Sequence, residues 1–208
     1  MRVAIFGATG GLGRLLTAGA LAGGHAVTVL ARTPATLGDL APRLAVVRGA
    51  VGDLAAVEAV VGGQDAVIVA LGVKPTEHAG TFYSDSTVTI VRAMRERGAR
   101  RLICVSSWVV RDSLRHADPL SRVIGPLLLR GLYVDRERQE AAVRASGLEW
   151  VLVRPARLTD GARTGVARGA PDLAIGLTAR VTRADAADFV LSHLTDDTYL
   201  RQAVGIRG

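Results

Sequence analysis

Three glycines at a regular spacing are the first residues of this chain whose pattern points to chemistry. Gly7, Gly10 and Gly13 stand three residues apart in Gly7-Ala8-Thr9-Gly10-Gly11-Leu12-Gly13, after an apolar run and at the start of a helical pattern. The first glycine allows a tight turn, the second lets backbone N–H groups approach a pyrophosphate, and the third lets helix and strand pack closely. The motif predicts a dinucleotide site, with a purely structural turn as the alternative.

The residues after the second and third expected strands bear on which dinucleotide binds. An acidic residue there takes the ribose 2′-OH of NAD, whereas an arginine accommodates the 2′-phosphate of NADP. Arg32 follows the second strand and no carboxylate precedes Asp39, so NADP(H) is favoured over NAD(H), unless Arg32 is simply solvated. Asp53, with its neighbour Leu54, is placed to meet the adenine, and Asp53 is placed equally well to cap a helix.

The chain lacks the Tyr-x-x-x-Lys pair with which short-chain dehydrogenases usually reduce carbonyls. In that pair the lysine lowers the tyrosine pKa, so that the phenol acts as acid and base near neutral pH. Lys74 is the only lysine, and no tyrosine precedes a lysine by four residues. Ordinary alcohol dehydrogenation is therefore disfavoured.

Polar and small residues at three further strand ends are the remaining candidates. Ser106 and Ser107 follow the fifth strand, and their hydroxyls are placed to hold a carboxamide or polarise a substrate heteroatom, unless they only end the strand. Lys74 is expected either to meet a phosphate or anionic substrate or to be solvated. The other residues expected to face the nicotinamide are Leu71, Gly72 and Pro155.

Histidine and cysteine give no sign of metal or thiol chemistry. The four histidines are far apart in sequence and have no ligand spacing, so we expect no metal site and place them on the surface or in loops. Cys104, the single cysteine, lies in the apolar run Leu102-Ile103-Cys104-Val105, which predicts a buried, inert thiol.

Composition limits the remaining possibilities. The 208 residues are 49% hydrophobic and 22% charged, which predicts one globular domain, residues 1–208, rather than a disordered chain. The net charge is +7, but aromatic residues are few and the tightest basic group, Arg97, Arg100 and Arg101, stands at a helix end, so nucleic-acid binding is disfavoured. The opening strand leaves no room for a signal peptide and the apolar runs are too short to span a bilayer, so we expect a cytoplasmic protein with no membrane contact.

Strand-like and helix-like segments alternate from the first residue. This order predicts an α/β fold, a Rossmann-type doubly wound parallel sheet in which ligands bind at the carboxyl edge. The part from about residue 108 to 208 is expected to contribute the substrate cleft as a small cap. Strands are expected at Arg2–Phe6, Ala26–Ala31, Leu44–Arg48, Ala66–Ala70, Arg101–Ser106, Glu149–Arg154 and Ala203–Ile206, and helices at Gly11–Ala22, Pro34–Leu40, Leu54–Val61, Phe82–Arg97, Val134–Ala145 and Ala184–Leu194.

Several segments together resemble a known family. They are Ala4 to Gly10, Val27 to Arg32, Gly63 to Val69, Val105-Ser106-Ser107, Ser146 to Pro155 and Thr182 to Phe189. The chain resembles the atypical short-chain dehydrogenase/reductases of the NmrA-like group, and within it the biliverdin-IXβ reductase/flavin reductase branch. The resemblance implies NADPH bound across the strand ends, with hydride passed to a flat conjugated acceptor without a Tyr-Lys pair. It places Gly7, Thr9, Gly10, Arg32, Asp53, Leu71, Gly72, Ser106, Ser107 and Pro155 at the cofactor, with Ser107 as the foremost catalytic hydroxyl.

The leading hypothesis is thus an NADPH-dependent oxidoreductase acting on a flavin, quinone or tetrapyrrole-like acceptor. One alternative is an NADP(H)-binding redox sensor that acts through a protein partner. Another is a reductase, epimerase or cyclase acting on a specialised aromatic or polyketide-like metabolite. The apolar segment 111–131 is expected to lie over the cleft as a substrate pocket or to form a dimer face, so the protein is expected to be a monomer or a homodimer.

Overall fold

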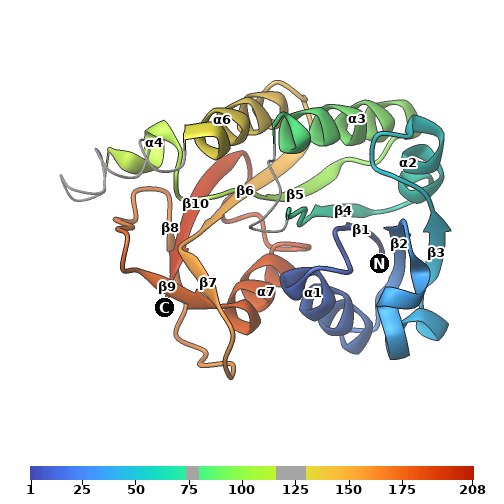
Figure 1. Ribbon diagram of the computed structural model, residues 1–208, viewed down its shortest axis with the longest axis horizontal. Coiled ribbons are helices and arrows are strands. Elements are labelled where there is room, and N and C mark those ends of the chain that lie inside the picture. Colours follow the sequence, from blue (N-terminus) through green and yellow to red (C-terminus); the bar gives the residue numbers. More distant parts are fainter. Residues whose placement is uncertain (74–79, 116–129) are drawn as a thin grey trace.

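A mostly parallel sheet between two layers of helices forms the protein, as the sequence predicts. The computed structural model describes residues 1–73, 80–115 and 130–208 (Figure 1). Eight strands follow the order β3-β2-β1-β4-β5-β6-β10-β8, and only β8 runs antiparallel to its neighbour. This arrangement confirms the predicted Rossmann-type fold.

The first half of the chain follows the predicted elements closely. The elements are β1 (Arg2–Phe6), α1 (Gly11–Ala22), β2 (Ala26–Ala31), η1 (Pro34–Arg43), β3 (Ala45–Arg48), α2 (Leu54–Val61), β4 (Ala66–Val69), α3 (Phe82–Arg97) and β5 (Arg101–Val105). The expected helix from Pro34 is a 3-10 segment that runs on to Arg43. Gly38 interrupts it with a φ of 56°, a left-handed conformation that suits glycine.

The second half departs further from prediction. It contains α4 (Arg111–Leu114), α6 (Arg130–Arg144), β6 (Glu149–Pro155), β7 (Arg157–Thr159), β8 (Arg168–Ala170), β9 (Arg180–Thr182), α7 (Arg183–Ser192) and β10 (Gln202–Arg207). The sequence reading missed β7, β8 and β9, each only three residues long. Most of the apolar segment 111–131 lies outside the described residues. No helix in the described part of the chain is long and apolar enough to cross a membrane.

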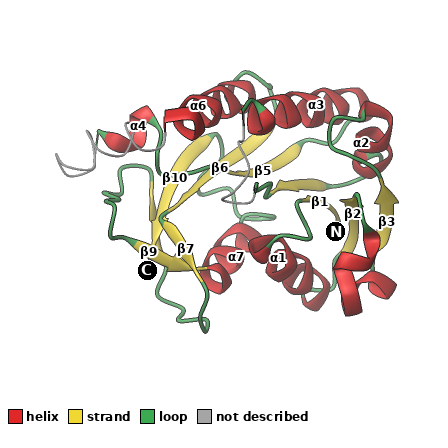
Figure 2. Ribbon diagram, in the orientation of Figure 1, coloured by secondary structure: helices red, strands yellow, loops and turns green. Residues whose placement is uncertain are grey.

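Alternating side chains of the strands pack into two separate cores. In β1, Val3 and Ile5 join the core beneath α1 and α7, whereas Ala4 and Phe6 join the core beneath α2, α3 and α6. All four side chains are fully buried. Because a parallel strand is covered on both faces, its sequence is a nearly continuous apolar run. Figure 2 shows the yellow sheet between the two red layers.

The sheet brings the predicted site segments to one edge. β1, β2, β4, β5 and β6 are mutually parallel neighbours, so their carboxyl ends lie together. Helices α1 and α7, which pack side by side, both begin at this carboxyl edge (Figure 1). β7 and β9 form a separate parallel pair just beyond the end of β6. The edge thus gathers the glycine turn, the serines after β5 and Pro155.

Candidate functional site

The glycine turn between β1 and α1 is shaped by close backbone contacts. Gly7 has a φ of 92°, and a Cβ on it would lie 2.3 Å from the carbonyl oxygen of Ala70, just after the neighbouring strand β4. A Cβ on Gly13 would lie 1.9 Å from the carbonyl oxygen of Gly7. Both positions therefore require glycine for the packing of α1 against the sheet.

The residues between these two glycines leave the start of α1 open. Thr9, Gly10 and Gly11 are exposed, and a Cβ on Gly10 would meet only the Gly7 carbonyl oxygen, at 3.4 Å. The Leu12 side chain is buried in the core, which leaves only its backbone N–H for a ligand. No side chain caps α1, and no acidic residue stands in its first turn. The positive end of this helix is thus left for an anion from outside the chain.

Arg32 stands exposed just beyond the end of β2. Its side chain makes no hydrogen bond or ion pair to any residue in the described ranges, so the guanidinium remains available to a ligand. No contact within residues 1–73, 80–115 and 130–208 requires an arginine at this position. An unpaired cation at the end of β2, the strand next to β1, suits the 2′-phosphate of an adenine ribose.

Asp53 caps helix α2. Its Oδ1 accepts hydrogen bonds from the backbone N–H groups of Ala55, at 3.1 Å, and Ala56, at 3.3 Å. The capping role considered from the sequence is therefore present, and Asp53 is also exposed at the carboxyl edge. Leu54 beside it is half-buried. Contact with an adenine remains a prediction.

Small or apolar residues stand where β4 and β6 end. Leu71 is half-buried and Gly72 is exposed after β4, while Pro155 is buried at the end of β6. The backbone N–H of Val73 donates to the Tyr83 hydroxyl at 3.2 Å, which ties this loop to α3. Lys74, the other candidate of this loop, lies outside the described residues.

The two serines after β5 have different surroundings. The Ser106 hydroxyl is buried and has no hydrogen-bond partner in the described part of the structure. Ser107 is half-buried, and its Oγ accepts from the backbone N–H of Val109 at 3.3 Å. Ser107 therefore keeps its O–H proton for donation and is the more accessible of the two hydroxyls.

A buried arginine behind these serines was missed in the sequence. The Arg136 guanidinium lies 3.4 Å from the centre of the Tyr83 ring and donates to the carbonyl of Val105, at 3.1 Å, and to Gln139, at 2.7 Å. Burial lowers the pKa of Arg136. Its Nε has no partner among the described residues. In a chain where all basic residues but one are arginines, the sequence offers no signal that separates this one from solvated ones.

Cys104 lies close to the same network and is buried, as predicted. Burial raises the pKa of its thiol to about 12, and Gln139 donates to its Sγ at 3.4 Å. Thiolate chemistry is therefore absent at this position.

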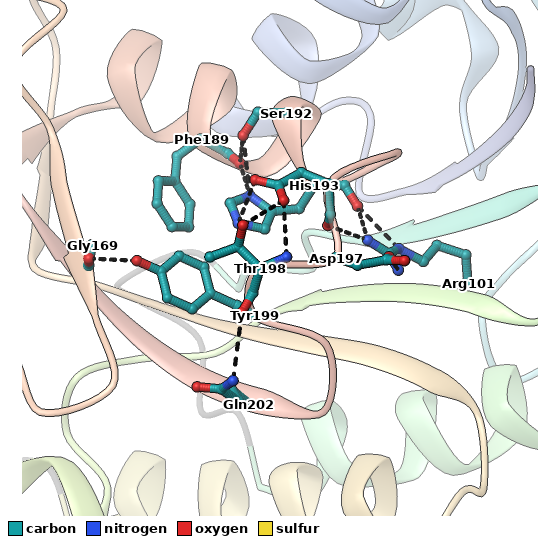
Figure 3. Close-up of polar contacts among 10 residues, drawn as sticks. Arg101, Gly169, Phe189, Ser192, His193, Asp197, Thr198, Tyr199 and Gln202 are labelled. Atoms are coloured by element: carbon teal, nitrogen blue, oxygen red, sulfur yellow. Dashed lines mark hydrogen bonds and ion pairs between the residues drawn. The ribbon is translucent and has the colours of Figure 1, made fainter.

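A second polar cluster lies at the opposite, amino edge of the sheet (Figure 3). His193 lies in the turn that follows α7, a loop position as predicted, but it is only 2% exposed and is not a surface residue. The His193 ring packs against the rings of both Phe189 and Tyr199, which also contact each other, and Nδ1 contacts the Phe189 carbonyl at 2.7 Å. Arg101 is not a helix-end cation either, since it is buried and donates to the carbonyls of His193 and Asp196. This cluster joins α7 to β5 and serves the fold.

The described residues hold no group of three or more His, Cys, Asp or Glu side chains arranged to bind a metal ion. His78 and His116 lie outside those residues.

Taken together, the residues at the carboxyl edge of the sheet offer a ligand the backbone N–H groups of α1, the exposed Arg32, the Ser107 hydroxyl and the half-buried Leu71.

Comparison with known proteins agrees with this geometry. A family model described as NAD(P)H-binding matches residues 7–197. A curated relative from Streptomyces griseus, (4-alkanoyl-5-oxo-2,5-dihydrofuran-3-yl)methyl phosphate reductase, is 33% identical over 154 residues, which cover 74% of this chain and 46% of the relative. The chain thus spans about half the length of that relative.

Two solved structures have the same fold over nearly their whole length. ChuY, an anaerobillin reductase from Escherichia coli O157:H7, superposes with a TM-score of 0.85 at 22% identity, covering 99% of this chain and 96% of that one. A short-chain dehydrogenase/reductase from Veillonella parvula, solved in complex with NADP, has a TM-score of 0.81 at 23% identity, covering 99% and 93%.

Proposed function

The chain belongs to the NAD(P)H-binding family, and from that premise we propose that it is an NADPH-dependent reductase whose hydride acceptor is flat and conjugated. A flavin, a quinone or a tetrapyrrole-like molecule fits this description. The observation that carries the proposal is the uncapped start of α1 beside the glycine turn, with the unpaired Arg32 at the end of the adjacent strand.

The residues at the edge fit an extended dinucleotide. Gly7, Thr9 and Gly10 form the turn, and the backbone N–H groups of Gly11, Leu12 and Gly13 at the start of α1 face its phosphates. Arg32 takes the 2′-phosphate, and Asp53 with Leu54 lies at the adenine. Leu71, Gly72 and Pro155 line the nicotinamide end. When bound there, NADPH supplies a hydride from C4 of its nicotinamide ring.

Ser107 holds the nicotinamide carboxamide or an oxygen of the acceptor, and Ser106, whose hydroxyl is buried, is the second candidate for this role. The acceptor takes up two electrons and one proton as hydride, and a second proton comes from solvent. A flavin or quinone is electron-poor before the reaction, so it needs no strong general acid. This fits a chain without a Tyr-Lys pair. Most of the rate then comes from holding the two rings in contact.

We assign the substrate cleft to the part of the chain from about residue 108 to 208. β7 and β9 stand beyond the end of β6, beside the edge where the nicotinamide is expected. Their position supports a cap on one side of the acceptor.

The named relatives support a reductase. The ChuY structure is that of an anaerobillin reductase, and the Veillonella parvula structure contains NADP. The Streptomyces griseus relative favours a second candidate, the reduction of a small specialised metabolite that carries a phosphate. Its name describes an unsaturated oxo-dihydrofuran, which is also a conjugated acceptor.

NADPH oxidation tests the proposal. The decay of nicotinamide absorbance is followed with FMN, riboflavin, biliverdin, simple quinones and an unsaturated furanone phosphate, and NADH replaces NADPH as the control. Turnover with a flavin, biliverdin or a quinone supports the first candidate, and turnover with the furanone phosphate alone supports the second. A folded protein that binds NADPH and oxidises it with none of them would contradict both.

A further inference from the structure

Arg183, the first residue of α7, reaches across the start of α1. A Cβ added to Gly11 would lie 3.0 Å from its Nε and 3.1 Å from its Cδ. Arg183 Nη1 donates to Asp160 Oδ1 at 2.6 Å. The arginine side chain is 29% exposed and the aspartate 94% exposed. The guanidinium therefore lies beside the glycine turn and remains partly open to solvent.

The position is electrostatically unfavourable for a cation in the isolated chain. The N-terminus of a helix carries partial positive charge, and Arg183 is at the N-terminus of α7 while it lies against that of α1. α1 has neither a side-chain cap nor an acidic residue in its first turn. α7 differs, since its first turn contains the carboxylate of Asp185 and its N-cap is Thr182, so the helix end without compensation is that of α1.

Asp160 compensates this charge only weakly. It is the one carboxylate within ion-pair distance of Arg183 in the described ranges, and a pair in which one partner is almost fully exposed contributes little. The pair also uses only Nη1. Nε and Nη2 make no hydrogen bond to the described residues, so donors remain for an anion.

We infer that Arg183 binds the pyrophosphate of the dinucleotide at the start of α1, together with the backbone N–H groups of Gly11 and Leu12. This inference rests on the proposed function, because it needs the dinucleotide to occupy the glycine turn. The planar fork of N–H donors in a guanidinium matches two phosphate oxygens. A negative charge there also compensates the positive end of α1, which no side chain of its own first turn compensates.

The inference gives Gly11 a specific role. Because Gly11 has no side chain, the Arg183 side chain can cross the start of α1, where a Cβ on Gly11 would be too close to its Nε and Cδ. Because NADH and NADPH share the pyrophosphate, Arg183 raises the affinity for both cofactors. Arg32, at the 2′-phosphate, affects NADPH alone.

A purely structural role for Arg183 makes a different prediction. If the ion pair served only to hold the residue after β7 against α7, removing either partner would have the same effect. If Arg183 binds the pyrophosphate, Asp160→Asn keeps the cation and frees Nη1, whereas Arg183→Gln removes the cation.

The test is a fluorescence titration of the full chain with NADPH and with NADH. Arg183→Gln is compared with Asp160→Asn and with Arg92→Gln, a control that removes an ion-paired arginine from α3 on the other face of the sheet. Circular dichroism checks the fold of each variant. We expect Arg183→Gln to lower the affinity for NADPH and for NADH about 10- to 100-fold. Asp160→Asn and Arg92→Gln should bind both cofactors at least as tightly as the wild type.

Two results would overturn the inference while the proposed function stands. One is a wild type that binds NADPH and an Arg183→Gln variant of equal affinity. The other is an equal loss in Arg183→Gln and Asp160→Asn. A folded wild type that binds neither cofactor would refute the proposed function itself.

Discussion

Replacing Arg32 by alanine tests the choice of cofactor. Arg32 is exposed and has no partner among the described residues, so replacing it breaks no contact that stabilises the fold. A charge-assisted hydrogen bond to phosphate is worth about 1.5 to 3 kcal/mol, or about 10- to 150-fold in affinity. Because the site is open to solvent, we expect the lower end, a loss of about tenfold for NADPH and almost none for NADH.

The assay is a pair of titrations of the wild type and Arg32→Ala, with NADPH and NADH followed by nicotinamide fluorescence. Arg43→Ala is the matched control, since Arg43 is an exposed arginine at the end of η1. Arg32→Lys keeps a charge and should lose less affinity than Arg32→Ala. An equal loss for NADPH and NADH in Arg32→Ala, or a similar loss in Arg43→Ala, would refute the assignment of Arg32 to the 2′-phosphate.

The remaining predictions concern the glycine turn and two buried groups. Gly10→Val should leave the protein folded, because a Cβ there meets only the Gly7 carbonyl oxygen. It should abolish NADPH binding, because the side chain keeps the pyrophosphate away from the backbone N–H groups; an unchanged affinity would discard the phosphate-turn assignment. Gly13→Ala should instead lower the free energy of unfolding by about 1 to 3 kcal/mol in urea denaturation, because its Cβ would overlap that carbonyl; unchanged stability would contradict the close packing of α1. The Cys104 thiol should react with a disulfide reagent only as the protein unfolds, because burial raises its pKa to about 12; fast reaction in the native state would contradict its burial. Burial raises the pKa of Asp185, but hydrogen bonds from Thr182, Gly165 and Thr164 outweigh it and leave the pKa well below the usual value. Asp185→Asn should therefore destabilise the protein by about 2 kcal/mol at neutral pH, with a smaller difference as the pH falls below about 4, the pKa of an unfolded aspartate; a difference that does not depend on pH would be evidence against this.

The elements that the sequence predicts best are those fixed by local signals. The strand Arg2–Phe6, the helix Gly11–Ala22 and the helix Phe82–Arg97 match residue for residue. Apolar runs of strand length and helix-ending glycines such as Gly98, with a φ of 78°, mark these boundaries without help from the rest of the chain. The glycine turn and the strand-end segments follow from the same signals, because parallel strands place their carboxyl ends together.

The missed features depend on contacts between distant residues. β7 and β9 are three residues each and form only because they pair with one another across about twenty residues of chain. Arg136, His193 and Arg183 have the sequence context of solvated residues, and only the packing of α6, α7 and α1 buries or positions them. Most of their partners are backbone carbonyls and aromatic rings, and the sequence does not show which carbonyl or ring a residue will contact.

The most direct test of the account is a single-turnover reaction without oxygen. The wild-type protein is loaded with NADPH and mixed with each acceptor in turn, and the nicotinamide and acceptor absorbances are recorded together. The account predicts that NADPH is oxidised and a conjugated acceptor is reduced in equal amounts, faster than with Gly10→Val. Bound NADPH that persists while every acceptor stays oxidised would contradict it.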